Sequence, residues 1–267
     1  MDIQTRNNVT VRGQGPATLI FAHGFGCDQT MWRRMIPAFE SRFRIVLFDL
    51  VGAGGSDLAA YDRQKYSTLD GYAADLVEVV EHFAQGPVII VSHSVSAMIS
   101  LLAAVAKPSL FTAHVMVGPS PCYISEGDYV GGFSRADIDD LLETLEENYL
   151  GWSSSMAPVI MGAPEDPELG VELTNSFCRT DPDIAAHFAR VTFLSDLRSE
   201  LAKNPIPTLI LQSTTDVIAP VSVGEYMCQV MPHAQLRVIK NIGHCPHLSA
   251  PTLSLESMEA FLKVMSL

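Results

Sequence analysis

The chain has 267 residues, which is enough for one large domain with a deep core or for a core domain that carries an inserted subdomain. Apolar residues make up 48% of the sequence and charged residues 18%, as is typical of a compact globular protein. The 30 acidic side chains outnumber the 17 basic ones, and the resulting net charge of −13 argues against nucleic acid or an anionic membrane surface as a partner. Solubility is the simplest explanation of such an acidic surface.

The five cysteines are dispersed, with no Cys-x-x-Cys pair and no Cys/His spacing typical of a metal site. We therefore expect reduced thiols in a reducing compartment. Residues 1–13 lack the apolar centre of a signal peptide, and the longest apolar stretch, near Met98 to Ala106, is too short to span a bilayer. These features predict a soluble, cytoplasmic protein that needs neither a metal nor a cofactor.

Short apolar runs alternate with amphipathic stretches, the pattern of a mostly parallel sheet flanked by helices. The polar start, from Ile3 to Gly15, predicts an antiparallel hairpin at the sheet edge. Each later apolar run has the length of a strand buried on both faces. The predicted strands are Thr18–Ala22, Arg44–Phe48, Pro87–Val91, His114–Val117, Thr208–Leu211 and Gln235–Ile239. The predicted helices are Met31–Glu40, Leu69–Ala84, Val95–Ala106, Val221–Met231 and Thr252–Val264.

The alternation stops between residues 125 and 199, where no strand is evident and several helix starts follow one another. Ser134, Asp166 and Asp181 are each placed to cap a helix, and both aspartates precede a proline at the first helical position. We expect a helical cap here, inserted in an α/β core of residues 1–124 and 200–267. Such a cap would cover the carboxyl ends of the strands, where open α/β sheets bind ligands.

A strand-to-helix junction at Ser94 has the layout of a nucleophile elbow, a strained turn that lifts a serine hydroxyl above the sheet. The usual Gly-x-Ser-x-Gly pattern is altered, because Ser92 and Ser96 stand at the two glycine positions. Glycine suits these positions because the strand and helix backbones approach closely, and serine is the next smallest polar residue. Taken alone, the motif also fits an ordinary turn.

Two later residues complete the pattern of a catalytic triad. Asp216 lies in a polar loop after one predicted strand, and His244 follows the next one in a Gly-His pair. The order Ser, Asp, His, with acid and base each just past a late strand, is that of α/β-hydrolases. Serine needs an imidazole to take its proton, and the imidazole needs a carboxylate to fix its tautomer. Individually, Asp216 could be a loop cap and His244 a buried structural histidine.

The loop after the first buried strand is expected to supply the oxyanion hole. The backbone N–H groups of Phe25 and Val95 would point at the developing oxyanion. Gly24 and Gly26 allow the backbone to bend close to the substrate. A glycine-rich loop could instead hold a phosphate, but the sequence has neither a Gly-x-Gly-x-x-Gly motif nor a P-loop lysine.

Three neighbours of the triad have simpler interpretations than catalysis. His93, next to Ser94, is expected to be a packing residue. His247 is a competing candidate for the base, but its place one turn beyond His244 makes it the weaker one. We expect Cys245 to be a small, buried, apolar side chain.

Several segments resemble the RsbQ-type hydrolases, bacterial stress-regulator proteins whose relatives include the plant strigolactone and karrikin receptors. The resemblance runs nearly end to end. The segments that carry it are Gly24–Trp32, Asp49–Asp57, His93–Ile99, Val117–Tyr123, Phe177–Pro182 and Gly243–Ser249.

The resemblance implies an α/β-hydrolase fold with a V-shaped cap of four helices over an apolar pocket. It places the triad on Ser94, Asp216 and His244, and it implies slow hydrolysis of a small hydrophobic ester or lactone-like ligand. The positions that match its pocket are Phe25, Phe133, Trp152 and Phe193, although the last three could equally be cap packing.

Because RsbQ-type proteins work with a PAS-domain phosphatase, the alternative to an esterase is a ligand sensor that docks such a regulatory partner. Cofactor-free perhydrolase or haloperoxidase chemistry uses the same triad. Ser92 replaces the glycine that is usual in this group. We expect this replacement to affect the turnover rate and to leave the fold unchanged.

Overall fold

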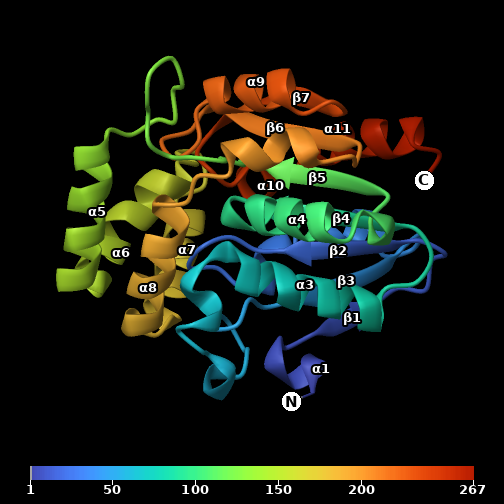
Figure 1. Ribbon diagram of the computed structural model, residues 1–267, viewed down its shortest axis with the longest axis horizontal. Helices are drawn as coiled ribbons and strands as arrows, with labels where there is room; N and C mark the ends of the chain where they lie inside the picture. Colours follow the sequence, from blue (N-terminus) through green and yellow to red (C-terminus); the bar gives the residue numbers. More distant parts are fainter. Residues whose placement is uncertain (1) are drawn as a thin grey trace.

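A seven-stranded sheet with the order β1-β3-β2-β4-β5-β6-β7 forms the centre of the computed structural model, which describes residues 2–267 (Figure 1). The edge strand β1 runs antiparallel to β3, and all the other neighbouring pairs are parallel. The strands are β1 (Thr10–Arg12), β2 (Thr18–Ala22), β3 (Arg44–Phe48), β4 (Val88–His93), β5 (Ala113–Val117), β6 (Thr208–Thr215) and β7 (Ala234–Ile242).

Helices connect and flank these strands. The α-helices are α1 (Ile3–Arg6), α2 (Ile36–Phe39), α3 (Leu69–Phe83), α4 (Val95–Ala106), α5 (Arg135–Glu147), α6 (Tyr149–Met161), α7 (Glu168–Arg179), α8 (Pro182–Phe193), α9 (Val221–Val230), α10 (Pro246–Ser249) and α11 (Pro251–Val264). The short 3-10 helices are η1 (Gln29–Trp32), η2 (Leu58–Ala60), η3 (Lys65–Ser67), η4 (Pro108–Leu110) and η5 (Arg198–Lys203). Within residues 2–267, every helix is too short or too polar to span a lipid bilayer.

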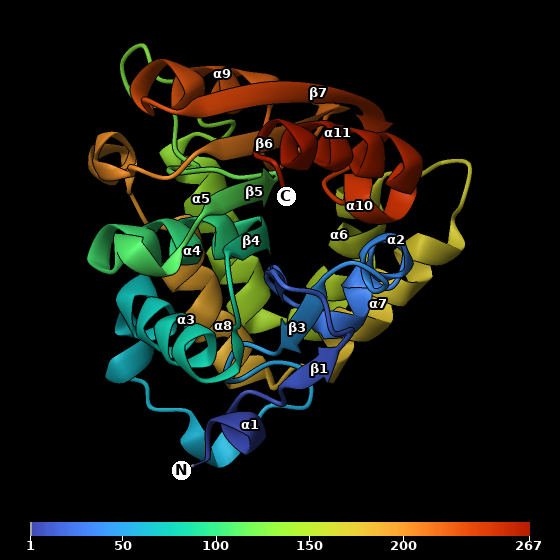
Figure 2. The ribbon, with the colours of Figure 1, turned by 90° about the vertical axis from the view of Figure 1, so that its right-hand side faces the viewer.

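The inner strands are buried on both faces, as their unbroken apolar runs predict. In β2, Leu19 and Phe21 belong to one apolar cluster, whereas Ile20 and Ala22 belong to the other. Figure 2 shows α3, α4 and α9 on one side of the sheet and α2, α10 and α11 on the opposite side. This arrangement confirms the predicted α/β fold.

Three predictions about the strands and helices outside residues 125–199 are wrong. The segment from Ile3 to Gly15 is no hairpin: the Asp2 side chain accepts a hydrogen bond from the Thr5 N–H and starts the helix α1, so that only β1 reaches the sheet. Strand β7 is not buried on both faces, because it lies at the open edge of the sheet. The helix predicted over Met31–Glu40 is divided into η1 and α2.

Helices α5 to α8 follow β5 in the chain and precede β6, and they lie together at one end of the sheet, on the left in Figure 1. Helix α6 packs against α7, and α5 packs against α8. Ser134 and Asp181 cap α5 and α8 as predicted, whereas Asp166 forms an ion pair with Arg34 (3.0 Å) and does not cap α7. The division into a core of residues 1–124 and 200–267 and a cap of residues 125–199 stays a prediction.

Candidate active site

Ser94 occupies a strained turn between β4 and α4. Its backbone has φ 55° and ψ −124°, a combination that non-glycine residues rarely adopt. The Ser94 N–H donates to the carbonyl oxygen of Val117 at the end of β5 (2.9 Å), which holds the turn against the neighbouring strand. Strain of this kind persists only where the surroundings fix it, and it is characteristic of the nucleophile elbow.

The serines at the two glycine positions of the elbow are accommodated inside the core. The Ser92 hydroxyl lies 3.1 Å from the hydroxyl of Ser100, and Ser96 donates to the carbonyl oxygen of His23 (2.5 Å). Both side chains are fully buried and have hydrogen-bond partners. Ser92 and Ser96 therefore fit the elbow without leaving a buried hydroxyl unpaired.

A continuous chain of hydrogen bonds joins Asp216, His244 and Ser94. His244 Nδ1 lies 2.7 Å from Asp216 Oδ2, and His244 Nε2 lies 2.8 Å from Ser94 Oγ. The other carboxylate oxygen, Oδ1, accepts from the N–H groups of Ile218 (2.8 Å) and Ala219 (3.1 Å). A carboxylate oxygen accepts hydrogen bonds, so in this arrangement Nδ1 is the protonated nitrogen of the imidazole and the unprotonated Nε2 faces the Ser94 hydroxyl.

The backbone of His244 is held from two sides. Its N–H donates to the carbonyl oxygen of Ile160 in α6 (2.8 Å), and its own carbonyl oxygen lies 3.0 Å from Nε2 of His93. Beside this bond, the N–H of Ala163, just after α6, donates to the carbonyl oxygen of Ile242 (3.2 Å). The end of α6 is therefore paired with the loop that contains His244. The candidate base thus contacts both the sheet and the inserted helices.

The residues predicted to form an oxyanion hole flank Ser94. Among residues 2–267, neither the N–H of Phe25 nor that of Val95 donates to a protein acceptor, so both donors remain free. A Cβ atom at Gly24 would lie 2.5 Å from His93 Nδ1 and 3.2 Å from Ser94 Cβ. Gly24 is therefore required for the Phe25 loop to approach the elbow so closely.

The other candidates near the triad are buried and neutral. Burial, together with the nearby His244, lowers the pKa of His247 to about 3, and its ring packs against those of Trp32 (4.5 Å) and His93 (4.7 Å). Burial also raises the pKa of the Cys245 thiol well above its usual value. Neither residue is poised to act on a substrate.

Metal-type ligands meet at one buried place beside the triad. Side-chain ligand atoms of His93, Cys245 and His247 lie within 4.8 Å of one another. Binding a cation there would require the Cys245 thiol to ionise in surroundings that strongly favour its neutral form, and His93 Nε2 already faces the carbonyl oxygen of His244. The arrangement fits a packed cluster of neutral side chains better than a metal site.

A small apolar cavity of about 30 Å³ lies over Ser94. Phe25, Trp152 and Phe193, three of the four residues predicted for the pocket, line it. The fourth, Phe133, is not among the residues that line this cavity. Its backbone pairs with Tyr123 and Ser125 in the loop before α5.

Several aromatic rings pack against one another around the Ser94 cavity. The Phe25 ring centre lies 5.8–6.2 Å from the ring centres of Trp152, Phe177 and Phe193, and Trp152 stacks on Phe177 (5.7 Å, 6°). Tyr123 packs on Phe193 (5.0 Å), and burial raises the pKa of its hydroxyl to about 12. Sequence reasoning does not single out Tyr123 or Phe177 for the cavity, although both lie in segments that carry the family resemblance.

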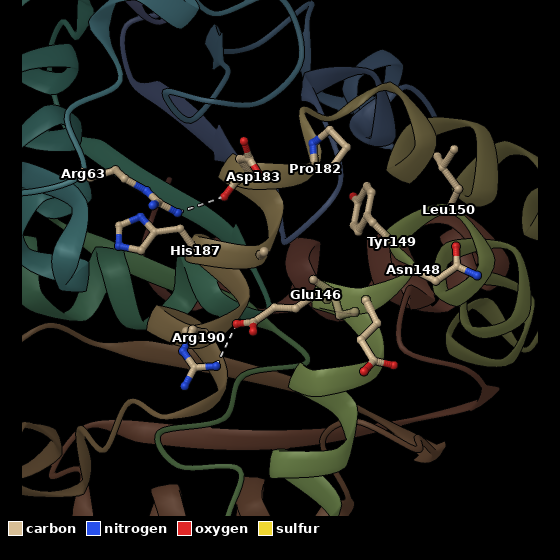
Figure 3. Close-up of a pocket in the computed structure, with 12 residues that line it drawn as sticks. Arg63, Glu146, Asn148, Tyr149, Leu150, Pro182, Asp183, His187 and Arg190 are labelled. Atoms are coloured by element: carbon tan, nitrogen blue, oxygen red, sulfur yellow. Dashed lines mark hydrogen bonds and ion pairs between the residues drawn. The ribbon is translucent and has the colours of Figure 1, made fainter.

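A larger groove of about 690 Å³ lies between α8 and the junction of α5 and α6 (Figure 3). Its walls bear an ion pair and a polar contact: Arg190 reaches Glu146 (2.7 Å), and Arg63 reaches the carbonyl oxygen of Asp183 (3.4 Å). The groove shares no lining residue with the Ser94 cavity. It is a surface groove with both charged and apolar residues in its lining, separate from the Ser94 cavity.

Comparison with known proteins agrees with this arrangement. The chain is 39% identical over 250 residues to the karrikin insensitive 2 receptor CA of Petunia hybrida, covering 93% of each chain. It is 38% identical over 245 residues to a strigolactone esterase of Arabidopsis thaliana, covering 91% of each chain. A solved hydrolase from Oleispira antarctica, 41% identical, matches 98% of this chain and 96% of its own with a TM-score of 0.93. The chain is thus similar to proteins named karrikin insensitive 2 receptor and strigolactone esterase. Residues 19–255 match the profile described as "Alpha/beta hydrolase family", and the chain therefore belongs to the alpha/beta hydrolase family.

Proposed function

We propose that the protein is a serine hydrolase that cleaves a small, uncharged and largely apolar ester or lactone through an acyl intermediate on Ser94. The observation that carries this proposal is the hydrogen-bonded chain from Asp216 through His244 to Ser94. The strained backbone of Ser94 and the free N–H groups of Phe25 and Val95 support it.

The reaction uses each of these groups in turn. As the Ser94 oxygen attacks the ester carbonyl carbon, Nε2 of His244 takes the hydroxyl proton and Asp216 stabilises the imidazolium. The N–H groups of Phe25 and Val95 hold the oxyanion. When the C–O bond breaks, His244 gives the proton to the departing alkoxide. A water molecule then attacks the acyl carbon and gives a proton to His244. As the bond between Ser94 Oγ and the acyl carbon breaks, His244 returns that proton to Ser94, and the acid is released.

The size and apolar lining of the cavity restrict the substrate to small, uncharged groups. Its lining is mainly aromatic and aliphatic, so a charged group would lose its hydration there without gaining an ionic partner. The cavity volume of about 30 Å³ is far below the roughly 300 Å³ typical of the smaller ligand sites. Substrates larger than a short acyl group therefore require the rings over Ser94, above all Trp152 and Phe193, to move.

Pre-steady-state hydrolysis of 4-nitrophenyl esters tests the proposal. We expect a burst of nitrophenol that is stoichiometric with enzyme, followed by slow turnover, and a preference for acetyl over octanoyl esters. Ser94→Ala should abolish the burst. Ser254→Ala replaces another buried serine, in α11, that does not line the Ser94 cavity, and this variant should keep the burst. An equal rate in the Ser94→Ala protein would refute the proposal.

A ligand sensor is the second candidate function, and the bond between the His244 N–H and Ile160 in α6 favours it. Through this bond, a shift of His244 on acylation or ligand binding at Ser94 would displace α6 and the helices packed against it. The Petunia relative is by its name a receptor. Ligand-dependent shifts in Tm with negligible steady-state turnover would support sensing, and rapid turnover without a shift would count against it.

The regulatory partner expected from the family resemblance, a PAS-domain phosphatase, stays a prediction. A sensor should bind such a phosphatase more tightly when a non-hydrolysable ester analogue occupies the Ser94 cavity. Calorimetric titration with and without the analogue measures that difference, and equal affinities would contradict the sensor hypothesis.

A further inference from the structure

His93 lies at the end of β4, directly before Ser94, and is almost fully buried. Its Nε2 atom lies 3.0 Å from the carbonyl oxygen of His244. Because a carbonyl oxygen only accepts hydrogen bonds, the His93 proton must be on Nε2. Burial and the neighbouring histidines hold the pKa of His93 well below its usual value, so the ring is neutral and Nδ1 carries no proton.

The opposite edge of the His93 ring meets the loop that contains Phe25. A Cβ atom at Gly24 would lie 2.5 Å from His93 Nδ1, so the ring edge sits directly against the Gly24 backbone. The ring centre is 4.9 Å from that of His244. One buried side chain thus contacts three parts of the site: the elbow, the base and the loop of the oxyanion donors.

The two hydrogen bonds that hold the His244 backbone are made by different parts of the fold. The N–H of His244 is bound by Ile160 of α6, in the helical segment that has to move if a larger ligand is to reach Ser94. The carbonyl oxygen of His244 is bound by His93, which belongs to the central sheet. The contact with His93 is therefore the one that does not depend on the position of the inserted helices.

We propose that His93 is a positioning residue whose Nε2–H holds the His244 backbone, and with it the distance between the base and Ser94, while the inserted helices move. The proposal rests on the proposed function of Ser94 and His244 as nucleophile and base. His93 takes no part in proton transfer, since its only proton is engaged with a carbonyl oxygen and its bare nitrogen faces the Gly24 backbone.

Two substitutions separate the hydrogen bond from the packing of the ring. His93→Leu fills the space but donates no hydrogen bond, whereas His93→Gln places an N–H near the position of Nε2. The matched control is His247→Leu: its ring lies 4.7 Å from that of His93, and neither of its nitrogens has a partner among residues 2–267.

Hydrolysis of 4-nitrophenyl acetate gives the first measurement. Displacement of a reacting group by about 1 Å can cost on the order of 100-fold, so His93→Leu should lower kcat about 10- to 100-fold with KM within about twofold. His93→Gln should restore kcat to within about threefold of the unmodified protein, and His247→Leu should stay within the same range. Far-UV circular dichroism and Tm report whether each variant is folded.

Proton NMR gives a second measurement that needs no turnover. The Nδ1 proton of His244, shared with Asp216, should give a low-field signal that shifts or broadens in His93→Leu and returns in His93→Gln. The proposal is overturned if folded His93→Leu keeps the kcat and this signal, or if His93→Gln is as impaired as His93→Leu. If the unmodified protein shows no Ser94-dependent turnover, the proposed function fails, and the NMR comparison alone decides the role of His93.

Discussion

Replacing Asp216 with asparagine tests the tautomer that the mechanism requires. In the structure, Oδ1 of Asp216 accepts two backbone N–H groups, from Ile218 and Ala219, and Oδ2 accepts the Nδ1 proton of His244. An asparagine keeps its oxygen on the two N–H groups, because an amide nitrogen there would face donors. Its NH₂ group then points at Nδ1 of His244 and donates, so the imidazole proton moves to Nε2.

With the proton on Nε2, His244 is no longer able to accept the proton of Ser94. Carboxylate-to-amide changes of this kind in Ser-His-Asp triads cost about 10⁴-fold in kcat. We expect a loss of about 10³- to 10⁴-fold for Asp216→Asn, equivalent to about 4–5.5 kcal/mol in activation free energy. KM should change little, because Asp216 is not in the lining of the Ser94 cavity.

The assay is hydrolysis of 4-nitrophenyl acetate at neutral pH by protein whose fold has been checked by circular dichroism. Asp196→Asn, a change at a surface carboxylate that pairs with Arg198, is the matched control and should keep full activity. A loss of less than about tenfold in Asp216→Asn would refute the assignment of Asp216 as the residue that fixes the tautomer of His244.

Three further changes test other parts of the account. Gly24→Ala should lower kcat/KM by about tenfold or more, because its Cβ would lie 2.5 Å from His93 Nδ1; unchanged kinetics would show that the loop can shift freely. Ser92→Gly should keep kcat within about threefold, since the Ser92 hydroxyl is bonded to Ser100 inside the core; a large gain would mean that Ser92 slows the enzyme. Burial lowers the pKa of His114 to about 3, so below about pH 6.5 the unfolded chain takes up a proton that the folded protein does not, and stability falls as the pH drops from there toward 3. Urea unfolding measures the free energy of unfolding at pH 7 and at pH 5. Its decrease between the two pH values should be smaller in His114→Leu than in the unmodified protein, by about 2 kcal/mol, and an equal decrease would show that His114 is not its cause.

The sheet and the triad are predictable from sequence because their signals are local. Continuous apolar runs mark the inner strands, and the residues that follow Val88–His93, Thr208–Thr215 and Ala234–Ile242 meet at one end of a parallel sheet whatever their separation in the chain. The order of Ser94, Asp216 and His244 along the chain therefore already specifies which side chains come together.

The other features depend on tertiary contacts that no short pattern encodes. Phe133 and Tyr123 lie on the same loop and are joined by a backbone hydrogen bond, yet only Tyr123 lines the cavity. The exposure of β7 follows from its place at the sheet edge, which its composition does not reveal. Likewise, the hydrogen bond from His93 to the backbone of His244 becomes visible only once the loop after β7 lies at the end of β4, although β5 and β6 separate these two strands in the sheet.

Covalent trapping of the nucleophile tests the central claim most directly. The protein is treated with a fluorophosphonate, digested and analysed by mass spectrometry to locate the adduct. The account predicts a single adduct on Ser94, formed rapidly in the unmodified protein and greatly slowed in His244→Ala. An adduct on another residue, or labelling of Ser94 at the same rate without His244, would contradict it.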